Sequence, residues 1–558
     1  MNEEEVQGLS GLKDGLLRPI DNDEEEQNKL SIDEMLQKWT GEFGWWQLRH
    51  FVLTSLAWTL EALHTMVMIF ADRQPPWQCK TSVREGFSLI NRRSDDWQFQ
   101  GSCNPESSIC SMVETSWEWT GGKGVSTVSE WGLICDDKYK VGVVQSMFFV
   151  GCLFGAGICG HLSDSSLGRK GVLTMVCALN AVLGVLTALS PNYWVYVTLR
   201  LFTGICTGGV GLSAYVLAME PVGPSKRGPV GMSVFYLFSL GVAVLPAISY
   251  WCPTWRSLYV VTSIPSALFC LLVLPFVSES PRWYLVRGRL KDAMDVMRSI
   301  GDKNGHTLPE GVSLILDNEE QSREGEEASG NLLDVLTSPM TRTRIILMVF
   351  IWFACALAYY GLSLNVVNLS SNLYVSVFLN GIAEMPAFAL TAALLNKFGR
   401  KAMLVSTMLL SGVSCIIGSV ISTLIHRPGG SVRTGFGFLI CVQVGCGLVG
   451  IFGMAGTYNL LYIYTSELFP TVVRNAALGL TSQAGHIGSI IAPLVVVTVG
   501  ISPWLPLAII GMAGIAGGIL GVKLPETLNR PMYETMPGME YGEKSIGEAA
   551  SAVSRSTV

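Results

Sequence analysis

Three ionisable side chains lie in the middle of long apolar stretches of the sequence: Glu61, Glu384 and His486. A charged group inside a membrane is costly, and such residues usually have a function or a buried partner. A carboxylate in a low-dielectric cavity is a natural counter-ion for an ammonium group. Glu384 is therefore the first candidate for substrate binding and Glu61 the second. The alternative is that each acid is protonated or paired with a neighbouring helix.

His486 offers a different chemistry, because an imidazole changes between its neutral and charged forms near about pH 6–7. At a substrate cavity it could make transport depend on pH, and it leaves cation and zwitterion substrates both open. The alternative is a neutral histidine that is hydrogen-bonded within a helix bundle.

Trp352 and Tyr359 share one apolar stretch and are seven residues apart. On a helix this spacing puts both side chains on one face, two turns apart. Aromatic faces attract alkylammonium groups by cation–π contacts worth about 0.5–2 kcal/mol each, so the pair could form part of a cage for a cation. Plain packing of the two rings is the alternative.

Charged residues at the ends of apolar stretches repeat along the chain. Glu220 and Arg227 are seven residues apart, and so are Glu467 and Arg474. The two arginines are separated by 247 positions. This spacing indicates that the second part of the chain repeats the first.

Two more pairs of motifs support the repeat. Glu279 and Glu526 are again 247 positions apart, and Gly-Arg-Lys occurs at 168–170, shortly after Asp164, and at 399–401. A parallel duplication of a six-span unit explains all of them. Acids and arginines at these ends could bridge the two halves when a gate shuts, or they could only fix the topology. The gating candidates are Asp164, Arg169, Glu220, Arg227, Glu279, Arg282, Arg400, Glu467, Arg474 and Glu526.

The elements that position these residues are membrane helices. Of the 558 residues, 49% are hydrophobic and 15% are charged, whereas soluble domains have about 25% charged residues. A crossing helix needs about 20 apolar residues. Such stretches lie near 48–70, 140–161, 171–190, 193–217, 230–250, 257–277, 344–367, 372–395, 402–425, 435–463, 475–498 and 503–522.

These stretches predict an all-α membrane protein with twelve transmembrane helices in two six-helix repeats. The polar, acidic start does not resemble a cleavable signal peptide. The expected divisions are a disordered acidic tail (1–45), an N-terminal half (46–277), a linker (278–342), a C-terminal half (343–522) and a second tail (523–558).

Lys and Arg in the short loops give the sidedness. Eight lie on one side and three on the other, which places both termini and the linker in the cytoplasm. The long loop at 72–138 then faces outside or into a lumen. Its four cysteines, Cys79, Cys103, Cys110 and Cys135, are expected to form two disulfides, with three pairings open and free thiols as the alternative. The sequence has no cysteine and histidine cluster at metal-ligand spacing, and no cofactor is expected.

The motifs after these stretches resemble those of the major facilitator superfamily, and of its plant-type organic cation/carnitine transporter branch. The narrower match rests on Ser-Glu-Trp-Gly-Leu-Ile-Cys at 129–135, Phe-Phe-Val-Gly at 148–151 and Glu-Ser-Pro-Arg-Trp at 279–283. Ser165 and Asn396 depart from the family pattern and weaken the inner gate inferred by analogy.

The resemblance implies a major facilitator fold with short amphipathic helices at the start of the linker, and it supports the site residues. It places Trp352 and Tyr359 at aromatic cavity positions, with Tyr215 and Phe238 at comparable ones. The position of His486 is acidic in animal organic cation carriers and basic in carnitine and anion carriers.

The sequence therefore predicts a carrier that moves organic cations, such as carnitine or polyamines, by alternating access. Its partners would be a small cation, membrane lipid and, as a candidate coupling ion, the proton; no nucleic acid and no enzymatic activity are expected. A proton-coupled sugar, polyol or zwitterion carrier and a non-transporting membrane sensor are the alternatives. The plasma membrane is the expected location, with the vacuolar membrane as the alternative.

Overall fold

The computed structural model describes most of the chain. The described residues are 29–80, 109–113, 116–309, 311–315, 332–369, 372–426, 436–530, 533 and 536–542. Cys103, the first 28 residues and the last 16 lie outside them, as does the acidic stretch of the linker.

Each of the twelve predicted stretches corresponds to a helix or to a run of consecutive helices. In the first half they are α4 (Trp45–Met66) with α5 (Met68–Ala71), η5 (Cys135–Lys138) with α8 (Tyr139–Asp164), α9 (Gly168–Ala188), α10 (Tyr193–Met219), α11 (Arg227–Ser233) with α12 (Phe235–Trp251), and α13 (Trp255–Leu268) with η6 (Phe269–Val273) and η7 (Leu274–Phe276). In the second half they are α18 (Pro339–Asn365) with η8 (Val366–Asn368), α19 (Leu373–Phe398), α20 (Arg400–Ile425), α21 (Phe436–Leu468), α22 (Thr471–Val497) with η9 (Thr498–Gly500), and α23 (Leu505–Gly521).

Eleven of these helices in the described part of the chain are long and apolar enough to cross a membrane. The twelfth, α23, is apolar but has 17 residues. Large apolar side chains such as Leu271 and Trp251 are 71% and 83% exposed. An apolar outer surface of this kind suits contact with lipid rather than water.

The chain forms two compact units. The bundle unit comprises Val52–Ala218, Gly228–Val277 and Glu327–Val558, and the linker unit comprises Met1–Phe51, Met219–Arg227 and Ser278–Glu326. The bundle unit therefore holds most of both predicted six-helix halves.

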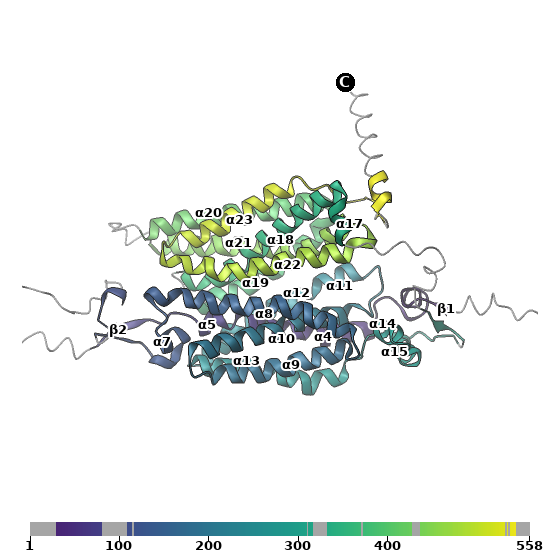
Figure 1. Ribbon diagram of the computed structural model, residues 1–558, viewed down its shortest axis with the longest axis horizontal. Helices are drawn as coiled ribbons and strands as arrows, with labels where there is room; N and C mark the ends of the chain where they lie inside the picture. Colours follow the sequence, from purple (N-terminus) through teal and green to yellow (C-terminus); the bar gives the residue numbers. More distant parts are fainter. Residues whose placement is uncertain are drawn as a thin grey trace, which may run out of the picture. The chain divides into compact units, whose positions relative to one another are not determined.

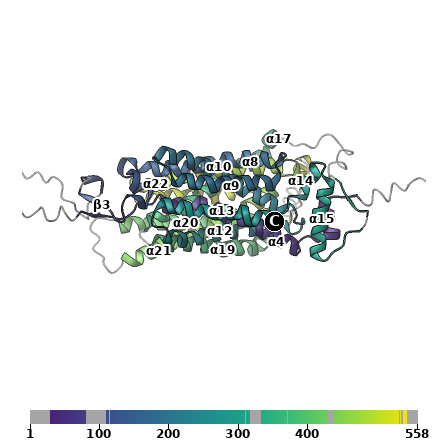
Figure 2. The same cartoon turned by 90° about the horizontal axis from the view of Figure 1, so that it is seen from below.

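Within the bundle unit, α18 packs on α22, and α20 packs on α21 and α23. In the first half, α9 packs on α13. The halves meet where α8 lies against α22 and where α12 lies against α19. Figures 1 and 2 show these helices running nearly parallel to one another, with α20, α21 and α23 together and α9, α10 and α13 together.

Close helix packing depends on glycines. A Cβ atom on Gly204 of α10 would overlap the carbonyl oxygen of Phe148, and one on Gly151 of α8 would overlap the carbonyl oxygen of Leu201. Small residues let membrane helices approach closely, because lipid gives no hydrophobic drive for their association. The α8–α10 pair is held by this backbone proximity.

The linker unit corrects the prediction of a disordered tail over 1–45 for the residues from 29 onward. Here β1 (Lys29–Leu30) pairs in parallel with β4 (Ser313–Leu314), and α3 (Ile32–Met35) continues into η1 (Leu36–Thr40). Ile32, Met35 and Leu36 are buried in one apolar cluster with Met297 of α15 (Leu290–Asn304). The prediction of disorder rested on the acidic composition and did not take account of these apolar residues. Their side chains bury enough surface to order the segment.

The linker has short helices at its start, as the family resemblance implies. They are α14 (Pro281–Val286) and α15 in the linker unit, and α17 (Leu332–Thr337) follows in the bundle unit. At the other end of the chain, residues 536–542 are helical. Met539 is buried there, with its sulfur 3.5 Å from Nη1 of Arg344, so the described part of the second tail packs on α18 within the bundle unit.

The described residues of the long loop at 72–138, here called the cysteine loop, are folded. Strand β2 (Trp77–Cys79) pairs antiparallel with β3 (Trp117–Trp119), and α7 (Thr127–Trp131) follows. A disulfide joins Cys110 to Cys135, and Cys79 is also disulfide-bonded. The loop is thus fixed to η5, directly before α8.

Candidate functional site

Glu384 lies on α19 with only 1% of its surface exposed. The Ser239 hydroxyl on α12 donates a hydrogen bond to Oε2, and the Tyr359 hydroxyl on α18 donates to Oε1 over 2.9 Å. Both carboxyl oxygens are therefore satisfied, as a buried polar group requires. The three helices belong to both halves, so the carboxyl lies where the halves meet.

Trp352 and Tyr359 belong to a larger group of rings, here called the aromatic cluster: Trp352, Tyr359, Tyr360, Tyr458 and Tyr462. Tyr458 of α21 bridges the predicted pair, with ring centroids 5.7 Å from Trp352 and 5.6 Å from Tyr359. Tyr462 lies 4.8 Å from Trp352, and Tyr360 lies 5.1 Å from Tyr359.

Tyr458 and Tyr462 were not predicted from the sequence. They are four residues apart on α21, a spacing that also puts two side chains on one helix face. Their stretch is apolar throughout, so periodicity alone could not indicate which face is buried. The fold makes that choice by packing α21 against α18.

Glu61 borders the aromatic cluster from α4. Its Oε2 atom is buried and has no hydrogen-bond partner among the described residues. A Cβ atom on Gly211 of α10 would overlap this carboxyl group. Glu61 lies near Tyr360 and Tyr462. Both predicted acids are therefore close to the aromatic cluster.

The other predicted binding residues surround this region less directly. Phe238 is buried with its ring 6.4 Å from Trp58. Tyr215 is within electrostatic reach of Tyr462. His486 is half-buried on α22 and follows Gly485, where an added Cβ would lie 3.2 Å from the Trp352 ring.

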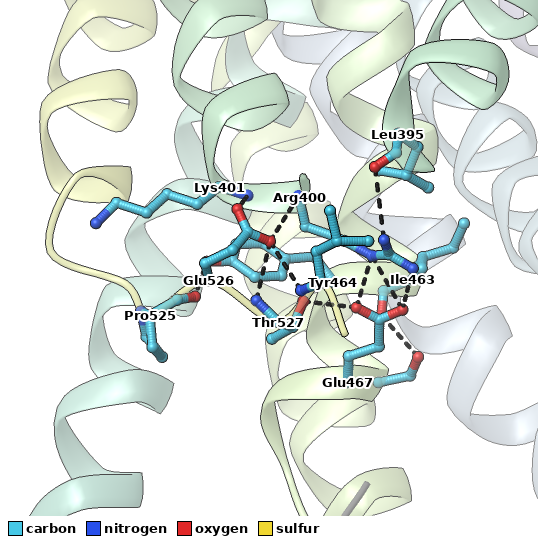
Figure 3. Close-up of polar contacts among 11 residues, drawn as sticks. Leu395, Arg400, Lys401, Ile463, Tyr464, Glu467, Pro525, Glu526 and Thr527 are labelled. Carbon is cyan, nitrogen blue, oxygen red and sulfur yellow. Dashed lines mark hydrogen bonds and ion pairs between the residues drawn. The ribbon is translucent and has the colours of Figure 1, made fainter. Parts of the chain in front are cut away.

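The gating candidates of the second half form a connected group (Figure 3). The Arg400 guanidinium donates to both carboxylate oxygens of Glu467, with Nε 2.9 Å from Oε2 and Nη2 3.0 Å from Oε1. Thr527 donates to Glu467 Oε2 over 2.6 Å. Arg400 therefore pairs with an acid of its own half.

Glu526 caps the start of α20. Its carboxylate accepts the backbone N–H groups of Arg400 (2.8 Å), Lys401 (3.1 Å) and Thr527 (2.9 Å). Burial acts to raise the pKa of this carboxyl group, but the backbone donors outweigh it and lower the pKa below the ordinary value. Gly399, with φ +90°, provides the space for the Glu526 side chain, because a Cβ atom at this position would overlap the carboxylate.

The remaining candidates also have partners. Arg169 pairs with Asp164 at 3.0 Å, and Arg474 Nε donates to the Ser466 carbonyl oxygen over 2.8 Å. In the linker unit, Glu279 accepts the Ser280 N–H over 2.9 Å. Also in the linker unit, Arg282 Nε donates to the Glu220 carbonyl oxygen over 3.4 Å, and Arg227 and Arg282 both bind Asp33.

A buried polar network in the first half was also missed by the sequence analysis. Asp72, just after α5, accepts hydrogen bonds from Thr127 (2.7 Å) and Tyr196 (2.8 Å). The Arg200 guanidinium lies 4.2 Å from the Phe148 ring centroid, and Tyr259 is hydrogen-bonded to Tyr196. These residues come from five separate segments, so no local pattern could reveal them.

The motif at 129–135 acquires a structural role. Glu130 accepts a hydrogen bond from Trp255 Nε1 over 2.6 Å and pairs with Arg256 at 2.5 Å. Trp131 packs its ring 5.3 Å from that of Trp255. The motif therefore fixes the end of the cysteine loop to the start of α13.

Comparisons with known proteins agree with this arrangement. Residues 98–537 match the family described as "Sugar (and other) transporter". The chain is 54% identical over 528 residues to "Organic cation/carnitine transporter 4" of Arabidopsis thaliana, covering 94% of each protein. It is 31% identical over 534 residues to the "Organic cation transporter protein" of Drosophila melanogaster, covering 90% of this chain and 94% of the relative.

Solved structures support the same fold. The inward-open xylose transporter XylE from E. coli gives a TM-score of 0.57 at 16% identity, covering 89% of this chain and 99% of that one. The proton:xylose symporter XylE bound to 6-bromo-6-deoxy-D-glucose gives a TM-score of 0.56 at 17% identity, covering 89% and 98%. At such identities the likeness shows the fold.

Proposed function

Because the chain belongs to the sugar (and other) transporter family and, within it, to the organic cation/carnitine transporters, we propose that it transports organic cations across a membrane by alternating access. The observation that carries this proposal is the buried Glu384 carboxyl, which is bound by hydroxyls from both halves. A single acid at the contact between the halves can bind a cation, and its hydrogen bonds depend on the relative position of the two halves.

Glu384 can take a cation as a further partner. In the structure its oxygens accept two hydroxyl donors, and the carboxylate that these donors orient can bind an ammonium ion beside them as a counter-charge. The aromatic cluster lies around Tyr359, and each ring that faces an alkylammonium group can add about 0.5–2 kcal/mol. These groups suit a cation that is partly apolar.

The finer assignments extend this proposal. Ammonium solutes such as carnitine and polyamines are the substrate class, with Glu61 as the second acid, and Tyr215, Phe238 and His486 complete the site. The membrane potential can drive cation entry, at about 2.3 kcal/mol per charge per 100 mV. Protons are the candidate coupling ion, and we place the carrier in the plasma membrane with both termini in the cytoplasm.

The gate is assigned to the repeated charged motifs. Arg400, Glu467 and Glu526 hold together the segments that follow the eighth, tenth and twelfth helices of the bundle. This group makes one end of the second half move as a body during rocking of the halves. The other proposed gating residues are Asp164, Arg169 and Arg474 in the bundle unit and, separately, Glu220, Arg227, Glu279 and Arg282 in the linker unit.

Uptake into cells that express the full chain tests the function. Labelled tetraethylammonium, carnitine and putrescine are supplied at about pH 5.5 and 7.5 to the wild type and to Glu384→Gln, with surface abundance measured in parallel. Loss of the carboxylate should reduce cation uptake about tenfold or more, since 1.4 kcal/mol is a factor of ten. The control is Glu118→Gln, an exposed acid of the cysteine loop.

Each outcome separates the alternatives. Equal uptake by the wild type and Glu384→Gln, at equal abundance, removes Glu384 from the site. Absence of uptake of all three compounds by a wild-type protein that reaches the membrane contradicts cation transport. Labelled sugars, polyols and zwitterions other than carnitine then become the substrates to test.

A further inference from the structure

Asp33 binds two arginines of the repeated motifs at once. Its Oδ1 atom is 2.5 Å from Nη2 of Arg227 and also accepts Nη2 of Arg282. The side chains of the three residues are 29%, 35% and 26% exposed, respectively. The group is therefore partly shielded from water, which strengthens the ion pairs relative to fully exposed ones.

The segment that carries Asp33 is fixed in place. Ser31 and Glu34 form a capping box at the start of α3, in which each side chain accepts the other's backbone N–H. Ile32 and Met35, on either side of Asp33, are 3% and 0% exposed in the apolar cluster of the linker unit. Asp33 is thus held by its neighbours and is not the mobile end of a tail.

One carboxylate joins three distant segments of the chain. Asp33 precedes the first membrane helix, Arg227 begins α11 directly before α12, and Arg282 lies in α14, which follows the sixth membrane helix. Helix α12 carries Ser239, which donates to Glu384. Covalent continuity therefore connects the Asp33 contacts to the helix that holds the proposed cation site.

The second half does not have the same charged residues at all of the equivalent positions. Arg474 lies 247 positions after Arg227, but the residue 247 positions after Arg282 is Asn529, which has no charge. In that half the connected group is built on Glu467 and Arg400. The acid that joins Arg227 and Arg282 in the first half is supplied by the segment before the first membrane helix.

We propose that Asp33 is a positioning residue of the transport cycle, which holds the starts of α11 and α14 and the segment before α4 together so that they move as one body. The proposal rests on the transport function proposed above. Loss of Asp33 should slow the change between conformations and leave substrate binding nearly unchanged. The residues before the first membrane helix are then part of the carrier's machinery.

The first experiment tests the contact without substrate. Hydrogen–deuterium exchange is measured on the purified full-length protein in detergent for the wild type, Asp33→Asn and Glu34→Gln. The Glu34 change removes an adjacent charge but keeps a capping box, because Gln serves at that position. Asp33→Asn should speed exchange about threefold or more in residues 219–227 and 278–288, and Glu34→Gln should not. Unchanged exchange in Asp33→Asn overturns the proposal.

The second experiment measures initial uptake rates against substrate concentration at matched surface abundance. Asp33→Asn should lower the maximal rate about threefold to tenfold, as expected for two partly exposed ion pairs, with the half-saturating concentration within twofold of wild type. Asp33→Glu should recover at least half of the rate. A normal maximal rate in Asp33→Asn overturns the role in transport even if exchange is faster.

A double-mutant cycle completes the test. If Asp33 and Arg282 act through their contact, the double variant Asp33→Asn with Arg282→Gln should have a maximal uptake rate no lower than that of the slower single variant. Fully additive losses contradict the contact. If Asp33→Asn fails to reach the membrane, Arg282→Gln replaces it, because it removes one of the two ion pairs of Asp33, and a normal maximal rate in that variant overturns the proposal. A wild type that transports nothing contradicts the proposed function, while the exchange experiment still decides the contact.

Discussion

The hydroxyl group of Tyr359 lies 2.9 Å from Oε1 of Glu384 and donates a hydrogen bond to it. Both residues are more than nine-tenths buried, and they come from neighbouring helices of the second half. The second oxygen of Glu384 accepts the hydroxyl of Ser239 from the first half. The Glu384 carboxyl group is therefore hydrogen-bonded to a helix of each half.

Tyr359→Phe should weaken cation uptake without abolishing it. The change removes one donor to the carboxylate, and hydrogen bonds to charged groups contribute about 1.5–3 kcal/mol. The half-saturating concentration should rise about fivefold or more, because the carboxylate that binds the cation loses one of its two donors. Concentration-dependent uptake of tetraethylammonium measures it. Tyr139→Phe, at a residue 55% exposed, is the control, and equal curves for both variants would contradict the role of Tyr359.

Gly155→Ala should destabilise the bundle unit, whereas Gly157→Ala on the same helix should not. A Cβ atom at Gly155 would overlap the carbonyl oxygen of Ile205, and one at Gly157 meets no atom within 4 Å. Forcing a methyl group into a packed contact costs about 1–3 kcal/mol. Thermal unfolding of the two purified variants, followed by tryptophan fluorescence, gives the comparison. Equal melting temperatures would show that α8 and α10 can move apart to accommodate the added methyl group without loss of stability.

Arg400 and Glu467 should behave as one unit. Their side chains are 14% and 15% exposed, so removing either partner leaves a largely buried charge without its counter-ion. Arg400→Gln and Glu467→Gln should each lower stability by about 2–4 kcal/mol, and the double variant should lose less than the sum. Thermal unfolding measures all three, with Lys397→Gln, an exposed cation three residues earlier, as the control. Additive losses would mean that the pair contributes little.

Glu526 makes stability depend on acid pH. Its pKa is lower in the folded protein than in the unfolded chain, because backbone N–H groups stabilise the carboxylate against the opposing effect of burial. Its contribution is therefore complete above the unfolded value and is lost as the pH falls through the folded value. The melting temperature should be flat from about pH 7 to 5 and fall below that, and Glu526→Gln should start lower and fall less steeply. A parallel fall in both proteins would exclude Glu526 as the cause.

The sequence predicts the helices well because their cause is local. An apolar stretch of bilayer length must form a helix to satisfy its backbone groups, and all twelve stretches correspond to helices in the structure. The spacing of Trp352 and Tyr359 likewise predicts a shared face, and both rings contact Tyr458. The roles of Glu384, Glu61 and the gating residues stay predictions that the experiments above address.

Only the tertiary structure decides which distant side chains meet. Ser239 is 145 residues from Glu384, and Asp33 is 194 residues from Arg227. Hydropathy and periodicity describe one segment at a time, so they place each residue on a helix without identifying its partner. The acidic composition of the first 45 residues even predicted disorder, where a few apolar side chains order the segment around Asp33. The sequence by itself determined the membrane helices, the repeat and the family resemblance, while the pairing of charges and rings depended on how the helices pack.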